Sequence, residues 1–344
     1  MTSFLKADRS QAVAWWLFAV AALVLILLVV GGATRLTDSG LSITEWRPAT
    51  GTIPPMSGAA WAVEFAKYQK IPQYAEVNAG MSLGEFQTLY WWEWTHRFLA
   101  RLVGLAFAVP FAFFLIRGMI PRRLVWRCVG LLMLGGLQGV AGWWMVSSGL
   151  ADRVSVAPER LAVHLGLALA LFAGLIWCGL EASTGQGRAH DKGPWANGAA
   201  ALLALIFVQC LLGALVAGND AGLIYNDWPL MNGRFWPADY AADGGLWATF
   251  AHSRAAVQFH HRMLAYLLVA LIAAFVLTAN RSRFIQPTVR SWVYMLGTVA
   301  FFQVLLGIAT LMMAAPLWLS ILHQVTAALL LAVAVALTWR ARRL

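Results

Sequence analysis

The residues best suited to chemistry in this chain are four histidines inside long apolar segments: His96, His164, His261 and His323. Glu93 stands three residues before His96, so a helix would place both side chains on one face. A single histidine in a membrane helix could simply hydrogen-bond a neighbouring helix. Ionisable residues inside the membrane are nevertheless functional candidates, and four of them at matching depths favour a binding site.

The number of histidines indicates what they could hold. Structural zinc needs three or four protein ligands, whereas each half of the chain offers two histidines without a nearby cysteine or second carboxylate. A haem iron takes four nitrogens from the porphyrin and its remaining ligands from protein side chains. Haem can fit in the core of a four-helix bundle. We therefore predict two haem sites, His96 with His164 and His261 with His323.

Three arginines stand close to these histidines in the sequence, namely Arg97, Arg101 and Arg262. Haem carries two propionates, and a guanidinium is a strong partner for a carboxylate. We expect these arginines to bind the propionates. The alternative is that they extend to lipid phosphates at the membrane surface.

The elements that would position these residues are membrane-spanning helices. Of 344 residues, 60% are hydrophobic and 12% are charged, whereas a soluble domain has about 25% charged residues. A span needs about 20 apolar residues, and the lipid core requires helices or closed barrels. The predicted fold class is therefore an all-α integral membrane protein with eight spans, at 13–34, 90–117, 124–147, 160–181, 196–217, 254–279, 290–313 and 316–340.

The basic residues predict the orientation of the spans. Loops with excess Lys and Arg stay in the cytoplasm, which places both termini there and the longer segments 35–89 and 218–253 outside. The haem sites then lie toward the periplasm, and we expect a bacterial cytoplasmic membrane. The net charge of +10 indicates contact with anionic lipid rather than nucleic acid. The residues on the cytoplasmic side would be Lys6, Arg9, Arg117, Arg122, Arg123, Arg127, Arg188, Lys192, Arg281, Arg283, Arg290, Arg340, Arg342 and Arg343.

The second half of the chain repeats the first. The sequence HRFLA from His96 matches HRMLA from His261, and QGVAG from Gln138 matches QVLLG from Gln303. VHLGLALALF matches LHQVTAALLL, and GLSITEW matches GLIYNDW, in the same order. We predict two tandem four-helix bundles, residues 1–185 and 186–344, related by a pseudo-two-fold axis along the membrane normal.

One position breaks this repeat. Glu93 corresponds to Gln258, which cannot ionise. A carboxylate can transfer protons or stabilise developing charge, so the first half would hold a catalytic haem site and the second an electron-transfer site. The alternative is that Glu93 forms a local ion pair with Arg97, four residues later.

Together these motifs resemble the haem A synthase family. The similarity is carried by Glu93-x-x-His96-Arg97, NDWPLMNG, FHHRMLAY and LHQVTAALLL, and covers nearly the whole chain. It implies oxidation of the C8 methyl of haem O to a formyl group, giving haem A for terminal oxidases. By match, His96 and His164 would flank the substrate haem O, Glu93 would be catalytic, and His261 and His323 would hold a resident haem b.

The resemblance has one departure and leaves one rival function. Some bacterial members have a cysteine pair in the first outer loop, but residues 35–89 contain none. Cys128, Cys178 and Cys210 fall in apolar runs and are expected to be inert. Haem O synthase and oxidase assembly factors are the implied partners. The rival is a di-haem b-type electron carrier linked to quinol, because the histidines alone fit either function.

Overall fold

The computed structural model describes residues 2–184, 193–241 and 244–343. Throughout these ranges the regular structure is helical, and the sole β-type pairing described is an isolated bridge between Met231 and Arg234. Eight helices are long and apolar enough to cross a membrane, which confirms the predicted all-α class and number of spans. Arg188, His190 and Lys192, like the predicted boundary between the halves, lie outside the described residues.

The eight long helices follow the repeat order of the sequence. Their bounds are α1 (Thr2–Leu36), α4 (Leu83–Ile116), α5 (Arg122–Ser147) and α6 (Pro158–Thr184) in the first half, and α7 (Pro194–Gly218), α9 (Arg254–Arg281), α10 (Pro287–Met312) and α11 (Leu317–Ala341) in the second.

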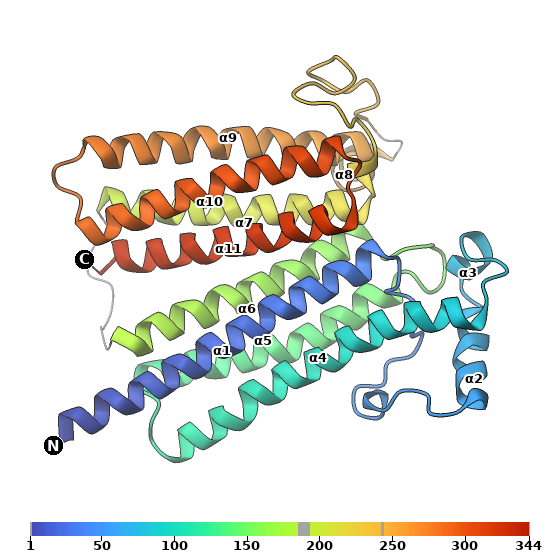
Figure 1. The fold of residues 1–344 in the computed structure, drawn as a ribbon, viewed down its shortest axis with the longest axis horizontal. Helices are drawn as coiled ribbons and strands as arrows, with labels where there is room; N and C mark the ends of the chain where they lie inside the picture. The colour runs from blue at the N-terminus through green and yellow to red at the C-terminus, as the bar shows by residue number, and fades with distance from the viewer. Residues whose placement is uncertain (1, 185–192, 242–243, 344) are drawn as a thin grey trace.

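The long helices pack as two groups of four, which lie side by side in Figure 1. In the first group α1 and α5 each contact both α4 and α6; in the second, α7 and α10 each contact both α9 and α11. Between the groups, α6 packs against α7 and α11, and α1 packs against α11. These neighbours fit the proposed tandem bundles, while the two-fold axis itself stays a prediction.

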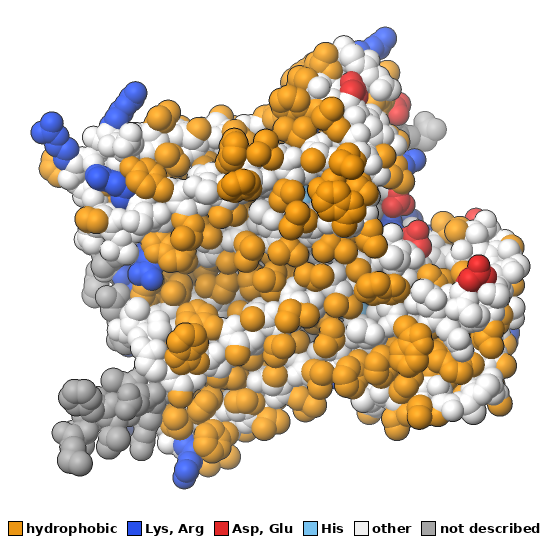
Figure 2. All heavy atoms as spheres, in the orientation of Figure 1, with side chains coloured by type: hydrophobic (Ala, Val, Ile, Leu, Met, Phe, Trp, Pro, Cys, Tyr) orange, Lys and Arg blue, Asp and Glu red, His pale blue; other side chains and the backbone are white. Residues whose placement is uncertain are grey.

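The two ends of the molecule differ in charge. Both termini lie at the end opposite α2, α3 and α8 (Figure 1). In the face shown in Figure 2, Lys and Arg gather mainly at the end that holds the termini, and Asp and Glu gather at the other. This separation agrees with an even number of spans and with the orientation expected from the basic residues.

The longer connecting segments at the acidic end are folded. They contain η1 (Thr50–Thr52), α2 (Gly58–Tyr68), α3 (Pro72–Glu76), η2 (Ala221–Leu223) and α8 (Gly245–His252). Leu41, Tyr68 and Phe86 belong to a buried cluster that joins the first segment to the start of α4. Their aromatic content predicted packing, but these short helices were not expected from the sequence.

Helix α4 begins earlier than predicted. The Ser82 side chain accepts a hydrogen bond from the Glu85 backbone N–H, and the Glu85 carboxylate accepts one from the Ser82 N–H. This reciprocal cap fixes a helix start, so α4 starts at Leu83 rather than near residue 90. The helix extends about two turns beyond the expected span, and His96 therefore lies farther from its helix start than the other three histidines do.

Candidate functional site

The four histidines occupy four different helices, in two pairs. His96 of α4 and His164 of α6 lie within range of each other's charge, and so do His261 of α9 and His323 of α11. Each residue is half-buried. The structure thus brings together the pairs that the sequence predicted.

Each imidazole lies against a glycine of a neighbouring helix. A Cβ atom placed on Gly31 of α1 would be 2.9 Å from His96 Nε2, and one on Gly142 of α5 would be 3.1 Å from His164 Cε1. In the second half, a Cβ on Gly213 of α7 would be 3.3 Å from His261 Cε1. Any residue larger than glycine would therefore press on the ring.

The fourth histidine, His323, also lies against a glycine. A Cβ on Gly307 of α10 would be 2.9 Å from His323 Cε1. Gly142 and Gly307 hold the last position of the two matching motifs that begin at Gln138 and Gln303. Gly31 and Gly213 are separated by the same number of residues as the outer-loop motifs GLSITEW and GLIYNDW. These glycine–histidine contacts were not predicted, although the spacing between the two repeats relates the four glycines in pairs.

Three glutamines contact the histidine helices. Gln209 Nε2 lies 3.1 Å from His261 Nδ1 and donates to the His261 carbonyl at 2.9 Å. Gln138 Nε2 donates to the His164 carbonyl at 3.2 Å. Gln303 Nε2 lies 3.3 Å from His323 Nε2. These amides fix the histidine-bearing turns, and the sequence analysis assigned them no role.

The donor set suits a macrocycle better than a bare metal ion. Two histidines per half meet the two axial positions that a porphyrin leaves on its iron. Among the described residues, no group of three or more His, Cys, Asp and Glu side chains could hold a metal ion. His164 Nδ1 and His323 Nδ1 are buried without a hydrogen-bond partner. Each half therefore has two imidazoles packed against a neighbouring backbone, one of them with an unpartnered nitrogen. This arrangement fits a haem.

Glu93 is 2% exposed and its carboxylate is fully engaged. One oxygen accepts from the Ser42 hydroxyl and the Ile43 N–H, both at 2.8 Å. The other accepts from Arg97 at 2.5 Å. The ion pair that the sequence left open is therefore formed within α4, and the hydrogen bonds from Ser42 and Ile43 attach the first outer segment to this helix.

Arg97 and Arg262 contact loop carbonyls. Arg97 donates to the carbonyls of Ile43 and Glu45 at 2.9 and 3.0 Å. Arg262 donates to the carbonyls of Tyr225 and Asp227, at 2.6 and 3.1 Å. The described contacts of both arginines thus hold the outer segments in place, a role that the sequence analysis did not foresee.

Gln258 attaches the second outer segment to α9, but it donates hydrogen bonds to that segment where Glu93 accepts them. Its Nε2 donates to the carbonyls of Ala221 and Ile224 at 2.7 and 2.6 Å, and its Oε1 accepts from Arg262 at 3.1 Å. At the matching place, Glu93 accepts hydrogen bonds from the loop. The first half therefore has a carboxylate where the loop offers hydrogen-bond donors. The second half has an amide where the loop offers carbonyl acceptors.

The arginines differ in the side chains that they face. Glu93 balances Arg97, whereas Arg262 faces the neutral Gln258. Arg101 donates to the carbonyls of Pro48 and Arg47, both at 2.8 Å, and its second terminal nitrogen is buried without a partner. Arg262 Nε also lacks a partner. Arg101 and Arg262 thus each keep one buried nitrogen without a partner, and Asp227 is the carboxylate whose charge Arg262 meets.

The remaining polar residues of the outer segments have structural contacts. The Asp227 carboxylate accepts from the Asn232 and Gly233 N–H groups, which, together with the charge of Arg262, hold its pKa below the usual 3.8. His260 lies 2.8 Å from the Tyr240 hydroxyl, and His252 lies 3.7 Å from Glu159. Asp227 therefore closes a turn in the second outer segment.

Helix α1 joins the two sites. Gly31 seats His96, and the adjacent Gly32 faces the side chain of Gln324, which follows His323 on α11. Gln324 Nε2 also donates to the Leu28 carbonyl of α1 at 2.7 Å. Two consecutive glycines thus face His96 of the first pair and the residue that follows His323 of the second.

The fold and this site define a polytopic helical membrane protein with two histidine pairs. The sequence model of the COX15-CtaA family, described as cytochrome oxidase assembly protein, matches residues 14–335. The chain is similar over its full length to "Heme A synthase" of Caulobacter sp. (strain K31), at 60% identity and with 100% of both chains covered. It is 52% identical to the protein of that name from Parvibaculum lavamentivorans, covering 98% of this chain and 96% of the relative.

The chain therefore belongs to the COX15-CtaA family. This assignment confirms the resemblance to the haem A synthase family that the sequence motifs indicated.

Proposed function

We propose that this protein is a haem A synthase, an oxidoreductase that converts the C8 methyl of haem O to the formyl group of haem A. The observation that carries the proposal is the 60% identity, across the whole chain, to a relative named for that activity. The two glycine-seated histidine pairs support it, because the reaction needs one porphyrin as substrate and a route for electrons.

In the proposed N-terminal site, His96 and His164 hold the iron of haem O. Gly31 and Gly142 fix the imidazoles, so the porphyrin enters with its position set by two helices. Such positioning matters, because a displacement of about 1 Å at the reacting atom can cost about a hundredfold in rate. The farnesyl tail would lie between the apolar helices.

In the proposed C-terminal site, His261 and His323 hold a resident haem b, which supplies one-electron transfer when bound. Gln209 and Gln303 orient the imidazoles from α7 and α10. The contact of Gln324 with α1 keeps this site against the N-terminal one. An electron donor would reach the protein through this half.

For the propionates, the buried nitrogens without a partner favour Arg101 in the first half and Arg262 in the second. Arg97 is the weaker candidate, because Glu93 already balances it. Glu93 in turn contributes by holding residues 42–43 against α4, and its carboxylate is the candidate catalytic group of that site. The oxygen of Glu93 that faces Arg97 accepts one described hydrogen bond and keeps a lone pair that could take a proton.

The domain division, orientation and partners belong to the same proposal. Residues 1–185 would form the substrate bundle and residues 186–344 the haem b bundle. Both termini would face the cytoplasm, with the haem sites toward the periplasm of a bacterial inner membrane. A haem O synthase would deliver the substrate, and oxidase assembly factors would receive the product.

Pigment analysis tests this proposal. We expect the full chain, expressed with a haem O synthase in a host that lacks haem A, to yield haem A and haem B on extraction. His96→Ala and His164→Ala should abolish haem A and retain haem B. Extraction of haem B alone from the wild-type chain would instead favour the quinol-linked di-haem b carrier.

A further inference from the structure

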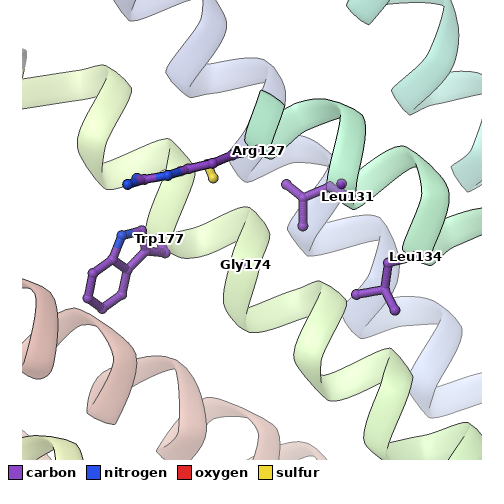
Figure 3. Close-up of a pocket in the computed structure, with 7 residues that line it drawn as sticks. Arg127, Leu131, Leu134, Gly174 and Trp177 are labelled. Atoms are coloured by element: carbon purple, nitrogen blue, oxygen red, sulfur yellow. The ribbon is translucent and has the colours of Figure 1, made fainter. Parts of the chain in front are cut away.

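A cavity of about 280 Å³ opens between α5 and α6 near the end of the molecule that holds the termini. Its apolar part is formed by Leu131, Leu134, Gly130 and Gly174. Figure 3 shows Arg127 and Trp177 at one end of this wall, with Leu131 and Leu134 following along α5. From Arg127 to Leu134 the helix rises about 10 Å. The cavity therefore pairs one cationic end with an elongated apolar wall.

The cationic end carries excess positive charge. Glu181 is 1% exposed and forms ion pairs with Arg123 at 3.2 Å, with Arg343 at 3.4 Å and with Arg127. Three guanidiniums thus share one carboxylate.

Trp177 adds to this concentration of cations. The guanidiniums of Arg342 and Arg343 lie over its ring, at 6.0 and 5.4 Å from the centroid. Arg343 Nε is buried without a partner. The cluster therefore attracts an anion beyond the carboxylate that it already contains.

We propose that this cavity binds one anionic phospholipid, with the phosphodiester on Arg123 and Arg127 and one acyl chain along Leu131 and Leu134. The side chains of Arg123 and Arg127 are 36% and 44% exposed. Each guanidinium has five N–H donors, so a phosphate can bind while Glu181 stays paired. This site is independent of the proposed haem chemistry.

The chemistry of the cavity selects this occupant. A zwitterionic lipid brings no net charge to balance the arginines, and inorganic phosphate cannot use the apolar wall. Basic pockets between membrane helices at the cytoplasmic face are typical sites for anionic lipid headgroups. Trp177 and the arginines occupy the end of the molecule where the termini lie, at the depth that amphipathic side chains prefer.

Lipid titration of the purified full-length protein tests the proposal. The melting temperature, followed by tryptophan fluorescence in detergent, should rise with added dioleoylphosphatidylglycerol more than with dioleoylphosphatidylcholine, because a ligand specific for the folded state stabilises it. Native mass spectrometry should show one retained phosphatidylglycerol per chain. Arg127→Gln should weaken the apparent affinity about tenfold by removing a charge-assisted contact.

Gly130→Leu provides a second variant, which fills the cavity. No atom lies within 4 Å of a Cβ at Gly130 or at Gly136, so leucine fits at both positions. Gly130→Leu should abolish the preference for phosphatidylglycerol, and Gly136→Leu, outside the cavity lining, should retain it. Arg283→Gln removes a charge that does not line the cavity and should also bind as wild type.

Four results would overturn the proposal. The two lipids could raise the melting temperature equally, or inorganic phosphate alone could produce the whole increase. Haem O could displace the retained lipid, which would assign the cavity to the tail of the substrate. Wild-type affinity in both Arg127→Gln and Gly130→Leu would also reject it.

Discussion

Arg97 and Arg262 bind carbonyl groups at repeat-related positions of their two outer segments. Arg97 holds Ile43 and Glu45, and Arg262 holds Tyr225 and Asp227, with the same spacing in each half. Both arginines also bind the side chain one turn earlier on their helix, Glu93 or Gln258. These arginine contacts, here called the clamp, are therefore present in both halves. The halves differ because Glu93 can ionise and Gln258 cannot.

Glu93→Gln should reduce haem A formation about a hundredfold while the helices stay folded and haem b stays bound. The amide keeps the size of the side chain but cannot balance Arg97 or accept all three hydrogen bonds, so the first outer segment shifts over the site. Extracted pigments and circular dichroism measure both effects. Glu85→Gln, on the same helix in an exposed cap, is the matched control. Normal haem A formation in Glu93→Gln would remove Glu93 from both its positioning and its catalytic role.

Gly142→Ala should lower haem A formation and spare haem b. The new methyl would be 3.1 Å from His164 Cε1, and overpacking of this kind costs about 1–3 kcal/mol. Gly139→Ala is the control on the same helix, because no atom lies within 4 Å of its Cβ. Equal haem A yields from the two variants would show that the glycine seat has no function.

His261→Ala and His323→Ala should each remove the low-spin haem b signal from the absorption spectrum. Each variant takes away one of the two imidazoles that are proposed to bind a single iron. His260→Ala is the control, since His260 bonds Tyr240 instead. A spectrum that is unchanged in both ligand variants would refute the C-terminal haem site.

The turn closed by Asp227 should loosen in acid. Hydrogen bonds from the Asn232 and Gly233 N–H groups and the charge of Arg262 lower the pKa of Asp227 below 3.8. Stabilisation from a carboxylate of lowered pKa is complete above its unfolded pKa and is lost as the pH falls through the folded value. The fluorescence of the neighbouring Trp228 should therefore change below about pH 3.8, and Asp227→Asn should remove that titration. An identical acid transition in the variant would assign it to another group.

Much of the fold could be predicted from the sequence, because lipid restricts the choice of structure. Apolar runs of sufficient length had to be helices, and the repeat related His96 to His261 and His164 to His323. The clamp could not be predicted, because an arginine near a histidine gives no indication of whether it meets a propionate or a carbonyl. The helices α2, α3 and α8 were missed since their tryptophan-rich segments lack the length of a span.

The early start of α4 had a recognisable signal that went unread. Ser82 and Glu85 have the spacing of a reciprocal helix cap, but they precede the apolar run on which the span was placed. The glycine seats had a weaker signal, since a glycine is informative only when its repeat partner is also aligned.

The glycine pair on α1 has a consequence for how this protein can be rebuilt. Gly31 touches His96 within the first bundle, and the adjacent Gly32 receives Gln324 from the second, so the helix that contacts a histidine of one bundle also makes room for the other. Chimaeras that join halves from different relatives should assemble only when the residues at Gly32 of α1 and at Gln324 of α11 come from the same parent. Evolution of one half is thereby tied to the other through the single methyl group that Gly32 lacks.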